Sequence, residues 1–500
     1  MDPIENMSHD HSRNLAEWAL AAGRFFQSPQ TKFIHLYYGE SSDLRAQTIP
    51  IIENVLFVLA LFRSRLVEQI QEGKGLLKQL LAFQQKQEED LGNFPVYVHE
   101  YPICHDPALS IQLLAPFYWI LKSFGHILGS DLKQQLEQTM CLALKYSIKA
   151  HQQKSFPYFL SVRLAAAQLT YGLLWDKEEW KQAGQAQMEQ WASLQLEGWN
   201  TTKQLANILI GLQMVYPSLS NSPWRPLWKR MEETWHLQLA CYMGPHVREW
   251  QEREEPQVNL YDLFGGFFSG QFSRRATLLS FHHLHGILIQ PSADQFKLET
   301  EMFPIIVGSK QQAWQSVFHH DYGYTLLEKK GPFQPSIDKT ETPFRFVWGD
   351  HHRLHSLVCQ GGNIEKVKAW KEGDEIVILF DLREQRDDEV GGTPKSEIEF
   401  FVDIHPDIQF RVNGLDSNTF GLGESFQILF KDYFLTIIFE LVQGEGDFFG
   451  HLMRGNRPSQ VDLKGEKRFQ AYDWTFFLRT IRRQNPCQIK ATLSLKNQFA

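Results

Sequence analysis

Hydrophobic residues recur with a helical period through the first half of the chain. Between residue 12 and about residue 250, apolar side chains return every three or four positions, with Gly, Pro, Asn or Asp between segments; clear cases are NLAEWALAAGRFF, IPIIENVLFVLALFRSRLVEQI, LSIQLLAPFYWILKSFGHIL, FLSVRLAAAQLTYGLL and PLWKRMEETWHLQLACYM. This spacing predicts about ten helices joined in antiparallel hairpins. Several segments are apolar almost all round, which favours an inner ring of helices covered by an outer one. We therefore predict an (α/α) toroid-like helical domain over residues 1–270.

The period changes to two near residue 295. Segments such as DEIVILFDL, SEIEFFVDI, ESFQILFKDYFLTIIFELV and CQIKATLSL alternate apolar and polar residues and are separated by turn sequences such as KEGDE and QGEGD. This pattern is typical of strands, and no helical segment comes between consecutive strands. The sequence predicts a junction over residues 271–294, followed by a C-terminal antiparallel β-sandwich over residues 295–500.

Composition narrows the partners of this two-domain chain. Aromatic residues make up 13% of the 500 residues, which suits extended aromatic-lined surfaces, and the net charge is −8. Such a charge gives no global basic field, so nucleic acid is not an expected partner. No apolar run is long enough for a membrane span. The N-terminus shows no signal peptide, which predicts a cytoplasmic location, with export by a non-classical route as the alternative.

Familiar catalytic motifs are absent from the sequence. It has no Walker loop, GxGxxG, GxSxG or HExxH motif, and its five cysteines are scattered without a CxxC pair. These absences disfavour nucleotide hydrolysis, dinucleotide redox chemistry and serine hydrolysis. No cofactor is expected, although a structural zinc or calcium ion stays open.

Two polar segments interrupt the helical half. The loop GNFPVYVHEYPICHD contains His99 and Glu100, which suit either acid/base chemistry or the capping of helix ends. The segment EGWNTTKQLANILIGL contains Asn200 and then a helix on which Lys203, Asn207 and Gly211 share one face. An asparagine in an apolar helix needs a partner, so Asn207 makes either a structural hydrogen bond or a ligand contact.

Two further groups lie towards the change of period. The end of the helical half contains aromatic, imidazole and guanidinium side chains that suit either a site or an interdomain hinge: His236, Tyr242, His246, Arg248 and Tyr261. Histidines follow in three clusters: His282, His283 and His285; His319 and His320; His351, His352 and His355. On a strand, His283 and His285 would point the same way, as would His351 and His355, so the two pairs could hold zinc or line a pocket. The pattern predicts no convergence of the pairs, which disfavours the metal.

This order of helical hairpins, aromatic junction and antiparallel strands resembles the (α/α)-toroid polysaccharide lyases, including heparinase II/III-like proteins. The resemblance implies a bound polysaccharide or oligosaccharide in a cleft between the helical and β domains. It also implies β-elimination at a uronic acid: an Asn, with a His or Arg, neutralises the uronate carboxylate, a Tyr or His removes the neighbouring proton, and a Tyr protonates the leaving oxygen.

The resemblance assigns these roles to particular residues. The catalytic set would be Asn207 for the carboxylate, Tyr261 for proton transfer, and His246 and His99. Six further residues would contact the glycan: Glu100, Asn200, Tyr242, Arg248, His351 and His352.

Two other functions fit the same architecture. A glycoside hydrolase would use two carboxylates about 5 to 9.5 Å apart, for which Glu100, Asp106 and Asp262 are candidates. A non-catalytic glycan-binding or scaffold protein would keep the aromatic surface without the acid/base groups. A carboxylate-to-amide substitution would inactivate the hydrolase, whereas Tyr261→Phe would inactivate the lyase.

Overall fold

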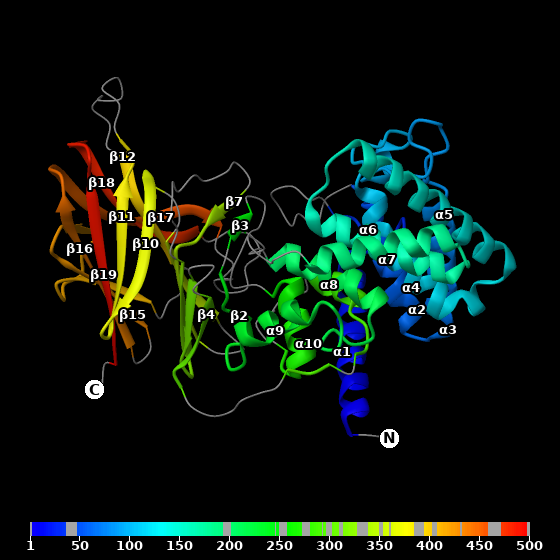
Figure 1. Cartoon of the computed structure of the whole chain (residues 1–500), viewed down its shortest axis with the longest axis horizontal. Coiled ribbons are helices and arrows are strands. Elements are labelled where there is room, and N and C mark those ends of the chain that lie inside the picture. Colours follow the sequence, from blue (N-terminus) through cyan, green and yellow to red (C-terminus); the bar gives the residue numbers. More distant parts are fainter. Residues whose placement is uncertain are drawn as a thin grey trace. The chain divides into compact units, whose positions relative to one another are not determined.

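The computed structural model comprises two compact units (Figure 1). It describes residues 3–36, 48–193, 202–245, 247–249, 258–272, 281–292, 294–296, 303–309, 314–327, 339–349, 354–359, 362–384, 395–402, 408–430, 433–458 and 472–497. The helical unit consists of Met1–Glu232, Val258–Phe272 and Ala276–Leu298. The β unit consists of Glu233–Gln257, Ser273–Arg275 and Glu299–Ala500.

The helical unit has an inner and an outer layer. The inner helices are α2 (Ile51–Arg63), α4 (Leu109–Leu128), α6 (Tyr158–Leu174) and α8 (Thr202–Val215), each packed against the next, and most of their residues are buried. The outer helices α3 (Val67–Leu81), α5 (Ser130–Gln153) and α7 (Glu178–Ser193) bury only one stripe. Helices that are apolar all round are therefore covered on both sides, as their sequences predict.

Three further helices close the inner layer. The long α1 (Pro3–Phe26) packs against α2, α10 (Leu260–Ser269) and α11 (Phe281–His285), and α10 packs against α8. Hydrogen bonds from Arg163 join residues near the starts of α4, α6 and α8, and Arg63 and Gln213, at the ends of α2 and α8, both bond to Gln290. The helices α2, α4, α6 and α8 therefore run in the same direction. Their N-terminal ends consequently lie at one rim of the ring, which we call the N-terminal rim.

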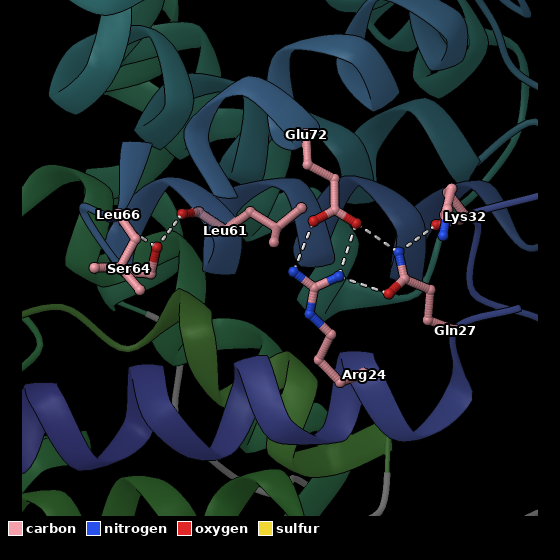
Figure 2. A network of polar contacts seen from close by, with 7 residues as sticks. All are labelled: Arg24, Gln27, Lys32, Leu61, Ser64, Leu66 and Glu72. Carbon is pink, nitrogen blue, oxygen red and sulfur yellow. Dashed lines mark hydrogen bonds and ion pairs between the residues drawn. The ribbon is translucent and has the colours of Figure 1, made fainter. Parts of the chain in front are cut away.

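A polar network ties α1 to the outer helix α3 (Figure 2). The Arg24 guanidinium makes two hydrogen bonds to the Glu72 carboxylate, at 2.7 and 2.6 Å. Gln27 donates to the same carboxylate and to the Lys32 carbonyl. This bidentate geometry holds the pKa of Glu72 below its ordinary value, chiefly through the hydrogen bond from Arg24.

The β unit contains two large antiparallel sheets. The nine-stranded sheet has the order β14-β17-β18-β12-β9-β8-β6-β5-β4, and the six-stranded sheet has the order β10-β11-β19-β16-β15-β13. The strands are β4 (Ile305–Ser309), β5 (Trp314–Phe318), β6 (Tyr322–Leu327), β8 (Phe344–Gly349), β9 (Leu354–Cys359), β10 (Ile364–Glu372), β11 (Glu375–Leu382), β12 (Lys395–Val402), β13 (Gln409–Val412), β14 (Thr419–Gly421), β15 (Ser425–Phe430), β16 (Tyr433–Gln443), β17 (Gly446–Pro458), β18 (Tyr472–Arg483) and β19 (Gln488–Asn497).

One apolar core joins these two sheets into a sandwich. Phe400 of the nine-stranded sheet contacts Phe380 and Phe439 of the six-stranded sheet, within a large cluster of buried residues. The pair of Arg483 and Glu397 is fully buried in this unit, with both side chains 0% exposed and a 2.9 Å contact. The predicted class, a helical half followed by an antiparallel β-sandwich, is confirmed.

One predicted helix ends earlier than expected. The sequence pattern extends a helix to Met243, whereas α9 (Arg225–Thr234) is followed by a small hairpin of β1 (Trp235–His236) and β2 (Cys241–Tyr242). Ala240 has a φ of 46°, which a right-handed helix does not allow. The hairpin belongs to the β unit, where Ser316 and Thr325 donate to the Met243 carbonyl. Tertiary hydrogen bonds therefore override the local helical pattern.

The two units interleave along the chain. The sequence pattern places boundaries at residues 270 and 295, whereas contacts assign Glu233–Gln257 to the β unit and Ala276–Leu298 to the helical unit. Among the described residues, no helix combines the length and the apolar character needed to cross a membrane.

Candidate functional site

A buried arginine connects three inner helices at the N-terminal rim. Arg163 of α6 donates from Nη1 to Asn207 Oδ1 on α8 at 2.7 Å, and from Nη2 to the Gln112 carbonyl on α4 at 2.7 Å. All three residues lie near the start of their helices. These contacts show that the N-terminal parts of α4, α6 and α8 lie side by side.

Arg163 is 4% exposed, and its charge has no anionic partner among the described residues. Burial lowers the pKa of Arg163 to about 10, so the guanidinium remains charged at neutral pH. Its Nε is buried and makes no hydrogen bond within the described part of the chain. A buried cation held only by neutral oxygens leaves a local excess of positive charge, which favours an anion nearby.

Arg163 also determines how Asn207 is oriented. A guanidinium only donates hydrogen bonds, so the oxygen of the Asn207 amide must face Arg163 and its nitrogen must face away. The nitrogen donates one hydrogen to the Lys203 carbonyl at 2.9 Å and has a second hydrogen to offer. Gly211 lies against Arg163 on the same face, so the predicted alignment of Lys203, Asn207 and Gly211 is confirmed. Asn207 is half-buried and Lys203 is exposed.

A second polar group joins α2 to α11. His285 Nε2 lies 3.0 Å from Glu53 Oε1, and Glu53 is buried in the most apolar stretch of α2. Burial lowers the pKa of the neighbouring His282 to about 3, with smaller contributions from the charges of His285, His283 and Lys203. The histidines predicted on a strand lie instead on this short helix.

The predicted loop residues His99 and Glu100 also lie at the N-terminal rim. They belong to the short helix η1 (Val98–Glu100), and the backbone before it pairs with the start of α2 through the Ile51 and Val98 amides. His99 is exposed and stacks on Tyr97, while the Glu100 carboxylate accepts from the Tyr97 amide. The topology thus brings His99, Glu100 and Asn207 to one rim.

The two predicted tyrosines lie in different units. Tyr261 is on α10 in the helical unit and is 2% exposed. Tyr242 is on β2 in the β unit, also buried, and its hydroxyl donates to the Pro245 carbonyl at 2.8 Å. Neither hydroxyl is open to solvent in this conformation, so the proton-transfer role of Tyr261 stays a prediction.

Several other predicted residues fall outside the described ranges: Asn200, His246, His351 and His352. Arg248 lies on β3 (Val247–Glu249), which pairs with β7 (Lys339–Glu341). Within the described ranges, no three His, Cys, Asp or Glu side chains gather in a way that suits a metal ion.

The fold of the chain has solved counterparts, although neither a protein-family model nor a curated protein matches its sequence. A xanthan lyase from Paenibacillus superimposes with a TM-score of 0.50 and 8% identity, over 99% of this chain and 57% of that one. The chain has the fold of a polysaccharide lyase. A chondroitin AC lyase from Streptomyces coelicolor A3 (TM-score 0.46, 10% identity, 99% and 80% of the two chains) and a heparinase III (0.43, 9%, 97% and 84%) were also found.

Two residues of this site were missed in the sequence pattern. Arg163 lies within FLSVRLAAAQLTYGLL and Glu53 within IPIIENVLFVLALF, both of which indicate buried helices. A charged side chain in the middle of such a helix has to find a partner from another helix. A charged side chain in a helix that is predicted to be buried is therefore the sequence signal that could have identified Arg163 and Glu53 as candidates.

Proposed function

We propose that this chain is a carbohydrate-active protein that cleaves a uronic-acid polysaccharide by β-elimination, with the uronate bound at the N-terminal rim of the helical unit. The observation that carries the proposal is the buried charge of Arg163, which has no anionic partner within the part of the chain that the structure describes and lies behind the amide of Asn207. A carboxylate accepting from the outward Asn207 nitrogen would meet this positive charge, together with that of Lys203. The polysaccharide lyase fold supports the substrate class.

Binding the carboxylate in this way would prepare the substrate for elimination. Neutralising its charge makes the proton on the neighbouring carbon easier to remove. A base takes that proton, the released electron pair forms a carbon–carbon double bond, and the bond to the glycosidic oxygen breaks. The leaving oxygen then takes a proton, and the product is an unsaturated uronate.

The carboxylates considered for a hydrolase have structural partners. Glu100 accepts from the Tyr97 amide, Asp106 from the Ala108 amide, and Asp262 from the Asn259 amide. Each of these contacts caps a turn or helix end, which is the ordinary structural use of such a side chain. None of the three is placed opposite another as an acid/base pair by these contacts, so we favour elimination.

The test is an ultraviolet assay for unsaturated uronate with heparan sulfate, hyaluronate, alginate and pectate, and with neutral starch as a control. We expect at least one uronate polymer to be cleaved, and Lys203→Ala to raise KM several-fold because a favourable charge is lost. Lys78→Ala is the matched control, since Lys78 is an exposed lysine on the outer helix α3. Cleavage of starch, or of no uronate polymer, would contradict the proposal.

A further inference from the structure

Arg479 is a charged side chain on β18, an interior strand of the nine-stranded sheet. Its guanidinium carbon lies 4.2 Å from the centre of the Phe477 ring. Within the described part of the chain, Arg479 makes no hydrogen bond or ion pair, and its Nε is buried. A guanidinium only donates hydrogen bonds, and it does so along its edge, in the plane of the group. The contact with Phe477 therefore holds the flat side of the guanidinium and leaves its donors for another molecule.

Arg479 and Phe477 lie on the outer face of the nine-stranded sheet. The residues on either side of Phe477 along β18 belong to the core of the sandwich, and side chains alternate along a strand. Phe477 is paired with Glu399 of β12 on one side and with His451 of β17 on the other. Neighbouring strands are about 4.8 Å apart. The guanidinium above Phe477 thus has a carboxylate on one neighbouring strand and an imidazole on the other, and we call these four residues the Arg479 face.

Two hydroxyl groups beside the Arg479 face also lack partners among the described residues. Thr475, two residues before Phe477, is 6% exposed, and its hydroxyl oxygen is buried without a hydrogen bond. Ser396 of β12 is paired with Arg479, and its hydroxyl oxygen is also buried and unbonded. Most buried hydroxyl groups in folded proteins have a partner. Three polar side chains without one, on two adjacent strands, point to a ligand that supplies their partners.

The charge around this face favours an anion. Apart from the buried pair of Arg483 and Glu397, the described side chains of β12, β17 and β18 include four cations and two carboxylates: Lys395, Arg454, Arg479 and Arg482; Glu399 and Asp447. The net charge of the whole chain is −8. A local excess of positive charge in an acidic chain attracts anions. The planar guanidinium suits a carboxylate or a sulfate, which it binds through two parallel N–H bonds.

We propose that the Arg479 face is a further binding site, within the β unit, for an acidic saccharide. Arg479 donates to a carboxylate or sulfate group of the ligand, and Glu399 and His451 contact hydroxyl groups of the same sugar or of its neighbour. Glu399 repels an anion on its own side, so the anion lies towards His451. The choice of a saccharide rests on the proposed function, because an acidic polysaccharide supplies both the anion and the hydroxyl groups.

The first experiment uses a methionine beside the site as a probe. Met453 of β17 is paired with Thr475 and is 49% exposed. The full chain is produced with carbon-labelled methionine methyl groups, and the Met453 signal is assigned by NMR with Met453→Leu. We expect oligosaccharides of alginate, which has only carboxylates, or of dextran sulfate, which has only sulfates, to shift this signal, and neutral maltohexaose to leave it unchanged.

The response to these probes decides the chemistry of the ligand. A shift with only one acidic oligosaccharide assigns the bound anion as carboxylate or sulfate. No shift with either, or an equal shift with maltohexaose, would overturn the proposal. Inorganic sulfate binding as tightly as the oligosaccharides would also overturn it, since the face would then be an ion site only.

The second experiment repeats the titration with variants, and thermal unfolding verifies that each is folded. Arg479→Gln should weaken binding by about ten- to a hundredfold, because a hydrogen bond between charged groups is lost, and Arg479→Lys should weaken it less. Glu399→Gln should tighten binding by removing the repulsion, which a purely structural role of Arg479 would not explain. Arg411→Gln, on β13 of the six-stranded sheet, is the matched control and should leave binding unchanged. Wild-type affinity in Arg479→Gln, or weaker binding in Glu399→Gln, would overturn the proposal.

The cleavage assay and the Met453 titration separate the two proposals. Cleavage of a uronate polymer without a Met453 shift would overturn the Arg479 face and leave the proposed function standing. A Met453 shift without cleavage of any uronate polymer would support the Arg479 face and contradict the proposed function. If neither is observed, both proposals fail.

Discussion

Replacing Asn207 with aspartate separates the structural role of this side chain from its role in binding. Arg163 Nη1 donates to Asn207 Oδ1 at 2.7 Å, and the aspartate keeps an oxygen at that position. The buried guanidinium gains a counter-charge, and a hydrogen bond to a charged group contributes about 1.5–3 kcal/mol. The lost donation to the Lys203 carbonyl costs about 1 kcal/mol. We therefore expect unchanged stability, or a gain of about 1 kcal/mol.

Binding of a uronate should change in the opposite direction. The aspartate loses the outward N–H and places a second carboxylate beside the bound one. Two such charges about 4 Å apart repel by about 4 kcal/mol at an effective dielectric constant of about 20. That energy corresponds to a fall in affinity on the order of 10³.

Asn207→Ala is the matched control. It leaves the Arg163 N–H without an acceptor, which costs about 1–3 kcal/mol of stability, and it introduces no repulsion, so affinity should fall by only about tenfold. Stability is measured by chemical denaturation and affinity by titration with the polymers used in the cleavage assay. An aspartate variant that binds as tightly as the wild type, or unfolds as easily as the alanine variant, would refute this reasoning.

Three predictions concern stability. Glu397→Ala should lower the unfolding free energy, measured by chemical denaturation, by about 3–5 kcal/mol, because it leaves the buried Arg483 charge unpaired. Glu440→Ala, at the exposed pair with Lys490, is the control and should cost less than about 1 kcal/mol. Equal losses in the two variants would contradict this prediction. Burial lowers the pKa of His236 to about 4, while Leu239 donates to its Nδ1 and its Nε2 contacts the His319 carbonyl. In this pH range the unfolded chain binds a proton at His236 that the folded chain does not bind. The unfolding free energy of the β unit should therefore fall by about 3 kcal/mol as the pH falls from about 6.5 to about 4. His236→Gln should remove this part of the acid sensitivity of unfolding. Glu72→Gln should cost less than about 1 kcal/mol of unfolding free energy at neutral pH, since the ion pair with Arg24 is partly exposed. Because the pKa of Glu72 is lowered, the difference between wild type and variant should vanish as acid protonates the wild-type carboxylate. A difference that persists in acid would exclude the ion pair as its source.

The layers of the fold could be predicted from the sequence because they depend on local patterns. Helices such as α2 and α6 are apolar all round, which is only stable in an inner layer, and alternating strands such as β15 bury one face. The face shared by Lys203, Asn207 and Gly211 follows directly from helical geometry. These features need no knowledge of distant segments.

The remaining features depend on contacts between distant segments. Arg163 finds Asn207 over 44 residues and Glu53 finds His285 over 232 residues, and no local pattern identifies such partners. The segment Trp235–Tyr242 has a helical pattern but folds as a hairpin, and the carbonyl of the next residue, Met243, is held by Ser316 and Thr325, more than 70 positions later. Sequence reasoning recognises that Arg163 and Glu53 each require a partner, and the tertiary structure supplies it.

The interleaving of the two units has a consequence for how the protein is made. Residues Glu233–Gln257 leave the ribosome before the strands that complete the β unit, such as β5 and β6, whose Ser316 and Thr325 hold the Met243 carbonyl. Likewise, Ala276–Leu298 must return to a helical unit whose first 232 residues were synthesised earlier. No single cut yields two fragments that each contain a complete unit. Recombination that joins one half of this chain to half of another gene therefore cannot exchange either unit as a whole.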